Sequence, residues 1–325
     1  MDALGGVGMN IIAIVKDAKC IGISGHVRPD GDCIGSCLAL RNYLLDVYPE
    51  KEIVVYLEKP ADKFMFLKGI SEIKQEIEVD KIHDVFFSLD AGEPDRLGFS
   101  MEGYQNAKVR CCIDHHISNT ATGETDYVVP TASSTCELIY NLIPQEALTK
   151  EIGECLYVGI SHDTGVFQYS NVKPSTMRAA AKLLELGVNG SEIIESTFYE
   201  KTYTQNRILG KALLESQLYC DGKVIAFGIS QKEMQEFGVK SGDMSAIVSQ
   251  LRNTQGVDVA IFLYENRENE YKVSLRSNDN LDCNQVANTF QGGGHKKAAG
   301  CMVAGTCEEI LERVLAVVDQ QFTQK

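Results

Sequence analysis

Short apolar segments alternate with helical patterns through the first half of the chain. The predicted strands are residues 20–24, 53–57, 85–89 and 109–113. The predicted helices are residues 34–47, 134–142 and 149–160. Strands that are apolar throughout and separated by helices are typical of a parallel sheet covered on both faces. The first half is therefore predicted to be an α/β domain.

The chain of 325 residues exceeds the usual size of a single hydrophobic core, so two domains are expected. The polar, helix-prone residues 191–216 are interpreted as a helical linker between a larger N-terminal domain at 1–190 and a smaller mixed α/β domain at 217–325. The predicted elements of the smaller domain are a strand at 224–229, a helix at 244–251, a hairpin of 257–264 and 271–275 with a polar turn at 265–270, and a helix at 308–322.

Composition and charge narrow the functional classes. No stretch approaches the ~20 consecutive apolar residues that span a bilayer, and no secretory signal is recognised, so a cytoplasmic protein without a membrane partner is expected. The 11 cysteines include no CxxC pair and mostly lie in apolar stretches, as do buried thiols in a reducing compartment. Nearly all of the net charge of −14 lies in residues 1–200. Because no basic stripe is visible, a long duplex nucleic acid is excluded as a partner.

Acidic and imidazole residues follow the predicted strands and the helix 149–160. They are His26, Asp30, Asp32, Asp90, Asp114, His115, His116, His162 and Asp163. Because the carboxyl ends of parallel strands meet at one sheet edge, most of these groups are expected to converge. Converging carboxylates repel one another unless cations neutralise them, and mixed carboxylate and imidazole ligands suit Mn²⁺ or Mg²⁺, with Fe²⁺ and Co²⁺ as alternatives. The ligands are too many for one ion, so two divalent ions sharing a carboxylate are predicted.

Five segments resemble, in order, the motifs of the DHH phosphoesterase superfamily. They are HVRPDGDCIGS, SLDAGEPDRLG, IDHHISN, GISHDTG and, near the C-terminus, the GGGHKKAAG of a DHHA1 domain. The resemblance implies a metal-binding DHH domain at 1–190 and a substrate-binding DHHA1 domain at 217–325. The overall size is similar to that of the oligoribonucleases (nano-RNases) that are also 3′-phosphoadenosine 5′-phosphate phosphatases. Gln291 stands where some relatives have a further glycine.

The resemblance also implies a role for each motif residue. One ion takes His26, Asp30 and Asp90, and the other takes Asp32, Asp90, His115 and Asp163. Asp114 orients a neighbouring group, and His116 faces the substrate, where it holds a phosphate oxygen or protonates the leaving oxygen. His162 matches no family role and is interpreted as a structural histidine.

Residues of the second domain resemble phosphate-binding groups. Gly293, Gly294 and His295 belong to the GGGH segment, in which glycines let backbone amides approach a phosphate. Arg276 and Ser277 end a predicted strand, and Arg276 offers a guanidinium fork. The expected partners are short single-stranded RNA, other oligonucleotides and 3′-phosphorylated adenosine nucleotides. A monomer and a homodimer are both compatible with the sequence.

The resemblance implies hydrolysis of short oligoribonucleotides and of 3′-phosphoadenosine 5′-phosphate by a hydroxide that bridges the two ions. A linear or cyclic dinucleotide phosphodiesterase is the alternative within the superfamily. A non-catalytic nucleotide sensor is the alternative from another functional class. Manganese pyrophosphatases share the first four motifs, but the GGGH domain speaks against that activity, and a processive exonuclease would need a basic channel.

Overall fold

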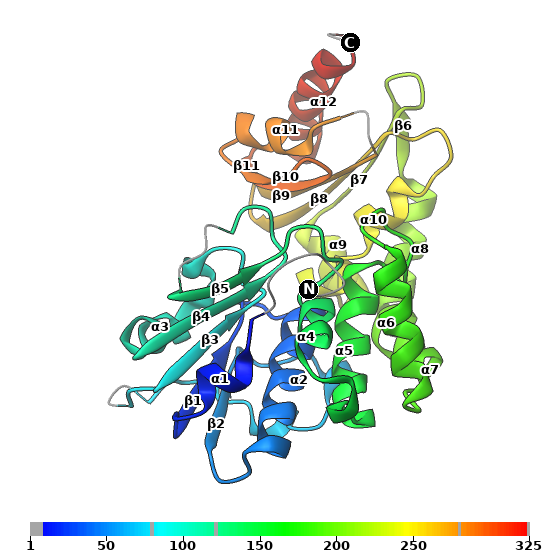
Figure 1. Cartoon of the computed structure of the whole chain (residues 1–325). Helices are drawn as coiled ribbons and strands as arrows, with labels where there is room; N and C mark the ends of the chain where they lie inside the picture. Colours follow the sequence, from blue (N-terminus) through cyan, green and yellow to red (C-terminus); the bar gives the residue numbers. More distant parts are fainter. Residues whose placement is uncertain (1–8, 79–80, 120–122, 279–280, 324–325) are drawn as a thin grey trace. The chain divides into compact units, whose positions relative to one another are not determined.

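The computed structural model describes residues 9–78, 81–119, 123–278 and 281–323. The chain forms two compact units, residues 1–200 and residues 201–325, which are described separately (Figure 1). Within the described residues, no helix combines the length and the apolar character needed to cross a membrane.

A five-stranded parallel sheet forms the centre of unit 1. Its strands are β1 (Cys20–Ser24), β2 (Glu52–Tyr56), β3 (Val85–Leu89), β4 (Val109–Asp114) and β5 (Thr125–Val128). They are hydrogen-bonded in the order β2-β1-β3-β4-β5, and each pair is parallel, which confirms the predicted α/β fold class. The sequence does not predict β5, because its four residues include two polar side chains. Since β1, β3 and β4 are neighbours, the loops that follow them start at one sheet edge.

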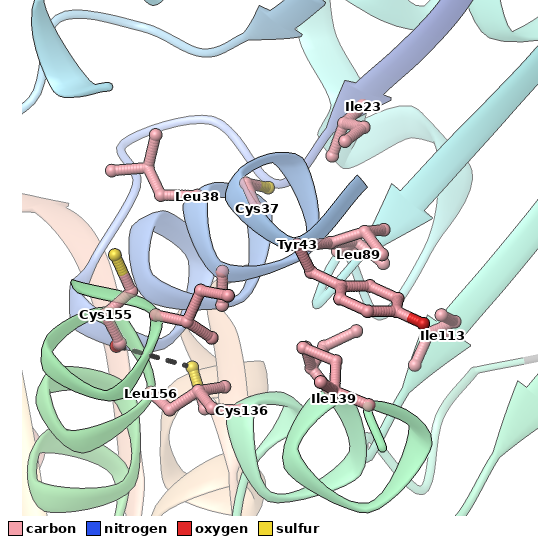
Figure 2. Close-up of a cluster of buried hydrophobic side chains, with 14 of the residues drawn as sticks. Ile23, Cys37, Leu38, Tyr43, Leu89, Ile113, Cys136, Ile139, Cys155 and Leu156 are labelled. Atoms are coloured by element: carbon pink, nitrogen blue, oxygen red, sulfur yellow. Dashed lines mark hydrogen bonds between the residues drawn. The ribbon is translucent and has the colours of Figure 1, made fainter. Parts of the chain in front are cut away.

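Helices cover both faces of this sheet. The helices of unit 1 are α1 (Ile11–Val15), α2 (Gly31–Val47), α3 (Met101–Asn106), α4 (Thr135–Leu142), α5 (Lys150–Asp163), α6 (Pro174–Glu185) and α7 (Gly190–Ile194). Figure 2 shows strand residues Ile23 and Ile113 packing in the main core with side chains of α2, α4 and α5. Cys136 and Cys155 are buried free thiols of this core. On the opposite face, a smaller cluster includes Phe86 of β3 and residues of α3.

Two glycines let α2 approach α4 and α5 closely. A Cβ atom on Gly35 of α2 would lie 2.4 Å from the carbonyl oxygen of Cys155 in α5. A Cβ atom on Gly159 of α5 would lie 2.6 Å from the Asp32 carboxylate at the start of α2 and 2.2 Å from Sγ of Cys136. Larger side chains at these positions would therefore push the helices apart and displace Asp32.

Unit 2 contains a mixed six-stranded sheet, as predicted for the second domain. Its strands are β6 (Gln217–Tyr219), β7 (Val224–Ile229), β8 (Val259–Arg267), β9 (Glu270–Ser277), β10 (Gly293–His295) and β11 (Ala298–Ala304), in the order β10-β11-β9-β8-β7-β6. Only the pair β7 and β8 is parallel. One apolar cluster joins the sheet to α8 (Tyr203–Glu215), α9 (Gln231–Phe237) and α10 (Ile247–Arg252), and another joins it to α11 (Cys283–Thr289) and α12 (Cys307–Thr323).

The β8–β9 hairpin departs from the sequence prediction. The predicted polar turn at 265–270 is wrong, because β8 continues to Arg267 and β9 already begins at Glu270. Asn269 adopts a left-handed backbone with φ of 55°, which allows a turn of two residues. The strand ends are exposed, so their polar side chains resemble those of a loop. The predicted helix 244–251 is also shifted, because α10 covers Ile247–Arg252.

The segment predicted as the linker contains several helical pieces. Residues 191–216 include most of α7, a π-helical turn at Glu195–Tyr199, and α8. The division between the two compact units falls within this segment, after Glu200.

Candidate metal centre

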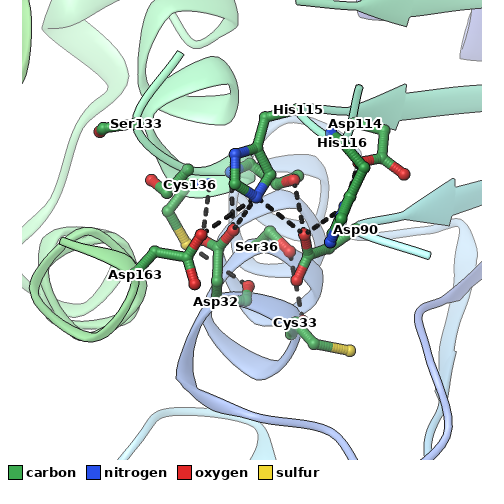
Figure 3. A network of polar contacts seen from close by, with 12 residues as sticks. Asp32, Cys33, Ser36, Asp90, Asp114, His115, His116, Ser133, Cys136 and Asp163 are labelled. Atoms are coloured by element: carbon green, nitrogen blue, oxygen red, sulfur yellow. Dashed lines mark hydrogen bonds and ion pairs between the residues drawn. The ribbon is translucent and has the colours of Figure 1, made fainter. Parts of the chain in front are cut away.

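Side chains from four separate segments converge at the carboxyl edge of the unit 1 sheet (Figure 3). His26 follows β1, Asp90 follows β3, and His115 follows β4. Asp30 and Asp32 lie at the start of α2, and Asp163 is the last residue of α5. The structure therefore brings together all six residues that the sequence nominates as metal ligands.

The ligand atoms form two clusters that share Asp90. In the first cluster, Nε2 of His26 lies 3.6 Å from Oδ1 of Asp30 and 3.7 Å from Oδ2 of Asp90. In the second, Nε2 of His115 lies 3.0 Å from Oδ2 of Asp163, 3.5 Å from Oδ1 of Asp90 and 3.9 Å from Oδ2 of Asp32. The two oxygens of Asp90 thus face two different histidines, as a bridging carboxylate would.

Burial and mutual repulsion disfavour negative charge on the two innermost carboxylates. Asp32 is fully buried, and burial together with Asp163 raises its pKa to about 7. Burial raises the pKa of Asp90 well above its ordinary value, and repulsion from the carboxylates of Asp32 and Asp163 adds to this shift. Asp90 also holds a left-handed backbone with φ of 56°, and such conformations are concentrated at functional sites. A divalent cation would reverse this electrostatic penalty.

The start of α2 positions Asp30 of the first cluster. Asp30 is the N-cap of α2, and its Oδ1 accepts hydrogen bonds from the amides of Asp32 (3.0 Å) and Cys33 (3.1 Å). Partial loss of hydration opposes ionisation of Asp30, whose side chain is 55% exposed, but His26 and these amides outweigh it and lower the pKa to about 2. Nδ1 of His26 donates to the carbonyl oxygen of Val27 (2.8 Å), which leaves Nε2 as the ligand atom.

The N-terminus of α4 supports the carboxylates of both clusters. The amides of Thr135 (2.6 Å) and Cys136 (2.9 Å) donate to the two oxygens of Asp32. The hydroxyl of Thr135 donates to Oδ1 of Asp90 (3.0 Å). Sequence reasoning missed Thr135. The pattern from Ser134 to Glu137 marks a helix start, but it does not show that the free amides of that helix meet Asp32.

Asp114 orients His116. Its Oδ1 accepts hydrogen bonds from the amide (2.8 Å) and from Nδ1 (2.7 Å) of His116, while its Oδ2 accepts from the amide of Gly92 (2.6 Å) and from Nδ2 of Asn119 (2.7 Å). Burial opposes charge on Asp114, but His116 and these amides lower the pKa to about 2. The ring of His116 is therefore fixed by an ionised carboxylate, and 23% of its side chain is exposed.

His162, next to Asp163, is partly buried within unit 1. Its Nε2 lies 2.9 Å from the Thr197 hydroxyl, and its ring packs against Phe64 and Phe198. Burial and the charge of Lys63 lower its pKa to about 4. A neutral, enclosed imidazole of this kind is typical of a structural residue.

The five nominated phosphate-binding residues all lie in unit 2. Arg276 of β9 pairs in register with Ala298 of β11, which pairs with His295 of β10. Gly293, Gly294 and His295 are exposed. The hydroxyl of Ser277, in contrast, is buried and donates to the carbonyl oxygen of Leu281 (2.8 Å), so it links the end of β9 to Leu281.

Comparison with known proteins gives matches along most of the chain. The profile of the DHH family, N-terminal domain, matches residues 20–160, and that of the DHHA1 domain matches residues 221–324. The chain is 30% identical over 307 residues to the bifunctional oligoribonuclease and PAP phosphatase NrnA of Thermus thermophilus, an alignment that covers 93% of this chain and 90% of that protein.

Two further relatives agree with this match. The chain is 28% identical over 296 residues to the Bacillus subtilis bifunctional oligoribonuclease and PAP phosphatase NrnA, covering 90% of this chain and 91% of the relative. The crystal structure of an exopolyphosphatase-related protein from Bacteroides fragilis superimposes with a TM-score of 0.86 at 27% identity, covering 95% and 94% of the two chains.

Proposed function

Because the chain belongs to the DHH phosphoesterase family and is a metal-dependent hydrolase with a DHHA1 domain, we propose that it hydrolyses short oligoribonucleotides and 3′-phosphoadenosine 5′-phosphate with two divalent ions. The observation that carries the proposal is Asp90, whose two oxygens face His26 and His115. The relatives named as oligoribonuclease and PAP phosphatase supply the substrate class.

The side chains present fit two divalent ions. The donor atoms of His26, Asp30 and Asp90 lie within 4.8 Å of one another, and so do those of Asp32, His115 and Asp163. The innermost carboxylates, Asp32 and Asp90, resist ionisation without a cation. The ligands proposed for the first ion are His26, Asp30 and Asp90, and those for the second are Asp32, Asp90, His115 and Asp163. This hard, mixed set suits Mn²⁺ best, with Mg²⁺, Fe²⁺ and Co²⁺ as weaker alternatives. When bound, such ions acidify water and neutralise charge on a phosphoryl group.

His116 is proposed to act on the substrate itself. Because Asp114 holds its Nδ1 hydrogen, Nε2 is the atom left to bind a phosphate oxygen or to protonate the leaving oxygen. Asp114 keeps the ring in that orientation. His116 and Asp114 therefore form the proposed catalytic pair.

Unit 2 is proposed to bind the rest of the substrate. Arg276, His295 and the amides of Gly293 and Gly294 are suited to a second phosphate or a neighbouring nucleotide. Ser277 would contribute indirectly, through the hydrogen bond of its hydroxyl to Leu281. Nearly all of the net charge of −14 lies in residues 1–200, so the electrostatic gain from a long strand is small.

A hydrolysis panel with Mn²⁺ tests the proposed function. We expect dinucleotides to pentanucleotides of RNA to be cleaved faster than 20-mers, and 3′-phosphoadenosine 5′-phosphate to release phosphate. Because nearly all of the net charge of −14 lies in residues 1–200 and no basic stripe is visible, the logarithm of kcat/KM should fall only shallowly with the logarithm of salt concentration. Cyclic dinucleotides and pyrophosphate should be poor substrates.

Three results of this panel would contradict the proposal. Preferred cleavage of 20-mers with a steep salt dependence would indicate an exonuclease for long strands. Exclusive cleavage of cyclic or linear dinucleotides would indicate a dinucleotide phosphodiesterase. Nucleotide binding without any product would indicate a sensor.

Replacing Thr135 tests the support given by α4. Thr135→Val keeps the side-chain shape and the hydrogen bond that the backbone N–H donates to Asp32, but it removes the hydroxyl that donates to Asp90. Mn²⁺ affinity and kcat/KM should therefore each fall by about 10- to 100-fold. Thr135→Ser, which keeps the hydroxyl, is the matched control and should stay close to the unsubstituted enzyme. Calorimetry with Mn²⁺ measures the affinity independently of turnover. Equal values for the two variants would show that the hydroxyl is unimportant.

A further inference from the structure

Unit 2 contains a cavity of about 390 Å³ beside the glycine-rich segment. Its lining includes Lys272, Phe290, Gln291, Gly292, Gly300 and Met302. Lys272 and Met302 are register partners on β9 and β11. The volume lies within the roughly 300–1,000 Å³ of small-molecule sites.

Gln291 occupies a backbone position that favours glycine. It follows the end of α11 and has a left-handed φ of 59°. The next amide, that of Gly292, donates to the carbonyl oxygen of Ala287 (2.9 Å), which closes the helix end. Glycine, or sometimes asparagine, is the usual residue at such a position, because a β-carbon is strained there. A glutamine at this strained position points to a use for its side chain, because strained backbone conformations are concentrated at functional sites.

The side chain of Gln291 is available to a ligand. It is exposed and lines the cavity, and its amide has no hydrogen-bond partner among the described residues. An amide offers an acceptor and two donors at one end, which matches the edge of a nucleobase. Glutamine can bind adenine in this way through N6 and N7.

The other lining groups suit the remaining parts of a nucleotide. The side chain of Met302 is 43% exposed. The ring of Phe290 contacts Arg313, which is not part of the cavity lining and whose guanidinium carbon lies 5.5 Å from the ring centre. Apolar and aromatic side chains of this kind provide a surface for the face of a base. Lys272 adds a positive charge for a phosphate, and its ammonium lies 5.9 Å from the centre of the Tyr264 ring.

We propose that this cavity binds the base of one nucleotide of the substrate and that Gln291 reads the hydrogen-bonding edge of the base, with a preference for adenine. This inference rests on the proposed function and deepens it, because it names a base-recognition site in unit 2. Gln291 is a specificity residue in this scheme. The chemistry stays with the residues of unit 1.

Equilibrium binding to the full chain in chelator tests this inference without hydrolysis. The probes are adenosine 5′-monophosphate and purine riboside 5′-monophosphate, which lacks the 6-amino group. The unsubstituted chain should bind the adenine nucleotide about 10-fold more tightly, and Gln291→Gly should bind both nucleotides equally. Gln291→Asn, which keeps an amide and tolerates the left-handed backbone, should retain part of the preference.

A second glycine substitution distinguishes the loss of the Gln291 side chain from the relief of strain at a left-handed backbone position. Asn269→Gly also relieves a left-handed position, at the β8–β9 turn, and should keep the full preference for adenine. The Tm of Gln291→Gly should equal or exceed that of the unsubstituted chain, because glycine removes the strain. Equal binding of the two nucleotides by the unsubstituted chain, or a preference that survives in Gln291→Gly, would overturn the base site. Failure of every phosphoester to be hydrolysed with Mn²⁺ would instead overturn the proposed function.

Discussion

Asp90→Asn is expected to reduce hydrolysis of every substrate by at least about 10³-fold, or about 4 kcal/mol of transition-state stabilisation. The substitution changes one oxygen to an amide nitrogen and so weakens the ligand that both clusters share. The fold should survive, because asparagine has nearly the same volume and removes a buried carboxylate whose pKa is already raised by burial. Measurement of kcat/KM with a dinucleotide and of Tm in chelator tests both expectations.

Asp163→Asn provides the matched comparison for Asp90→Asn. Asp163 belongs to the second cluster alone, where its Oδ2 lies 3.0 Å from Nε2 of His115, and 26% of its side chain is exposed. Its loss should therefore leave the first cluster intact and reduce Mn²⁺ binding by one ion per chain, whereas Asp90→Asn should weaken the binding of both ions. A near-normal kcat for Asp90→Asn would place the catalytic centre elsewhere.

The positions of most candidate ligands are predictable because they follow from strand order. His26, Asp90 and His115 each come shortly after an apolar strand, and parallel strands bring their carboxyl ends to a common edge. Asp30 lies in the same segment as His26, because it caps the helix that starts after β1. Asp163 belongs to the fourth segment and comes at the end of a helix, α5, so strand order alone does not predict its place.

The supporting contacts are not predictable in this way. The amide of Thr135 meets a carboxylate 103 residues earlier in the chain, and this contact depends on how α4 packs against α2. Strand β11 is likewise not predictable from the local sequence, because AAGCMVA consists largely of small residues with low β-propensity. It is a strand because its backbone pairs with β9 along seven residues. Local patterns therefore indicate elements and ligands, while long-range packing decides what orients them.

Removal of divalent metal is expected to abolish hydrolysis and to lower Tm, and Mn²⁺ should restore both better than Mg²⁺ does. An ion that binds only the folded chain stabilises it by about 2.7 kcal/mol at a concentration 100 times its Kd. Dialysis against chelator, followed by titration with each metal, measures Tm and kcat in one series. Full activity in chelator would exclude the metal mechanism.

The stabilisation by Mn²⁺ should grow as pH rises. Burial and Asp163 raise the pKa of Asp32 from 3.8 to about 7, while Asp163 and Asp32 overcome burial and raise that of His115 from 6.5 to about 9. In both cases the folded, metal-free chain holds a proton that the unfolded chain has released, so its stability falls as pH rises between about 4 and 9. Metal binding requires the deprotonated ligands and therefore improves over the same range.

A comparison of Tm with Mn²⁺ and with chelator, between pH 5 and pH 8, tests this linkage. The difference in Tm should be small at pH 5 and largest at pH 8, because the metal replaces the protons on Asp32 and His115. Asp32→Asn is the control: it removes the buried carboxylate, so its metal-free form should lose less stability with rising pH and should gain less from Mn²⁺. A Tm difference that is the same at both pH values would mean that these two groups do not bind the ion.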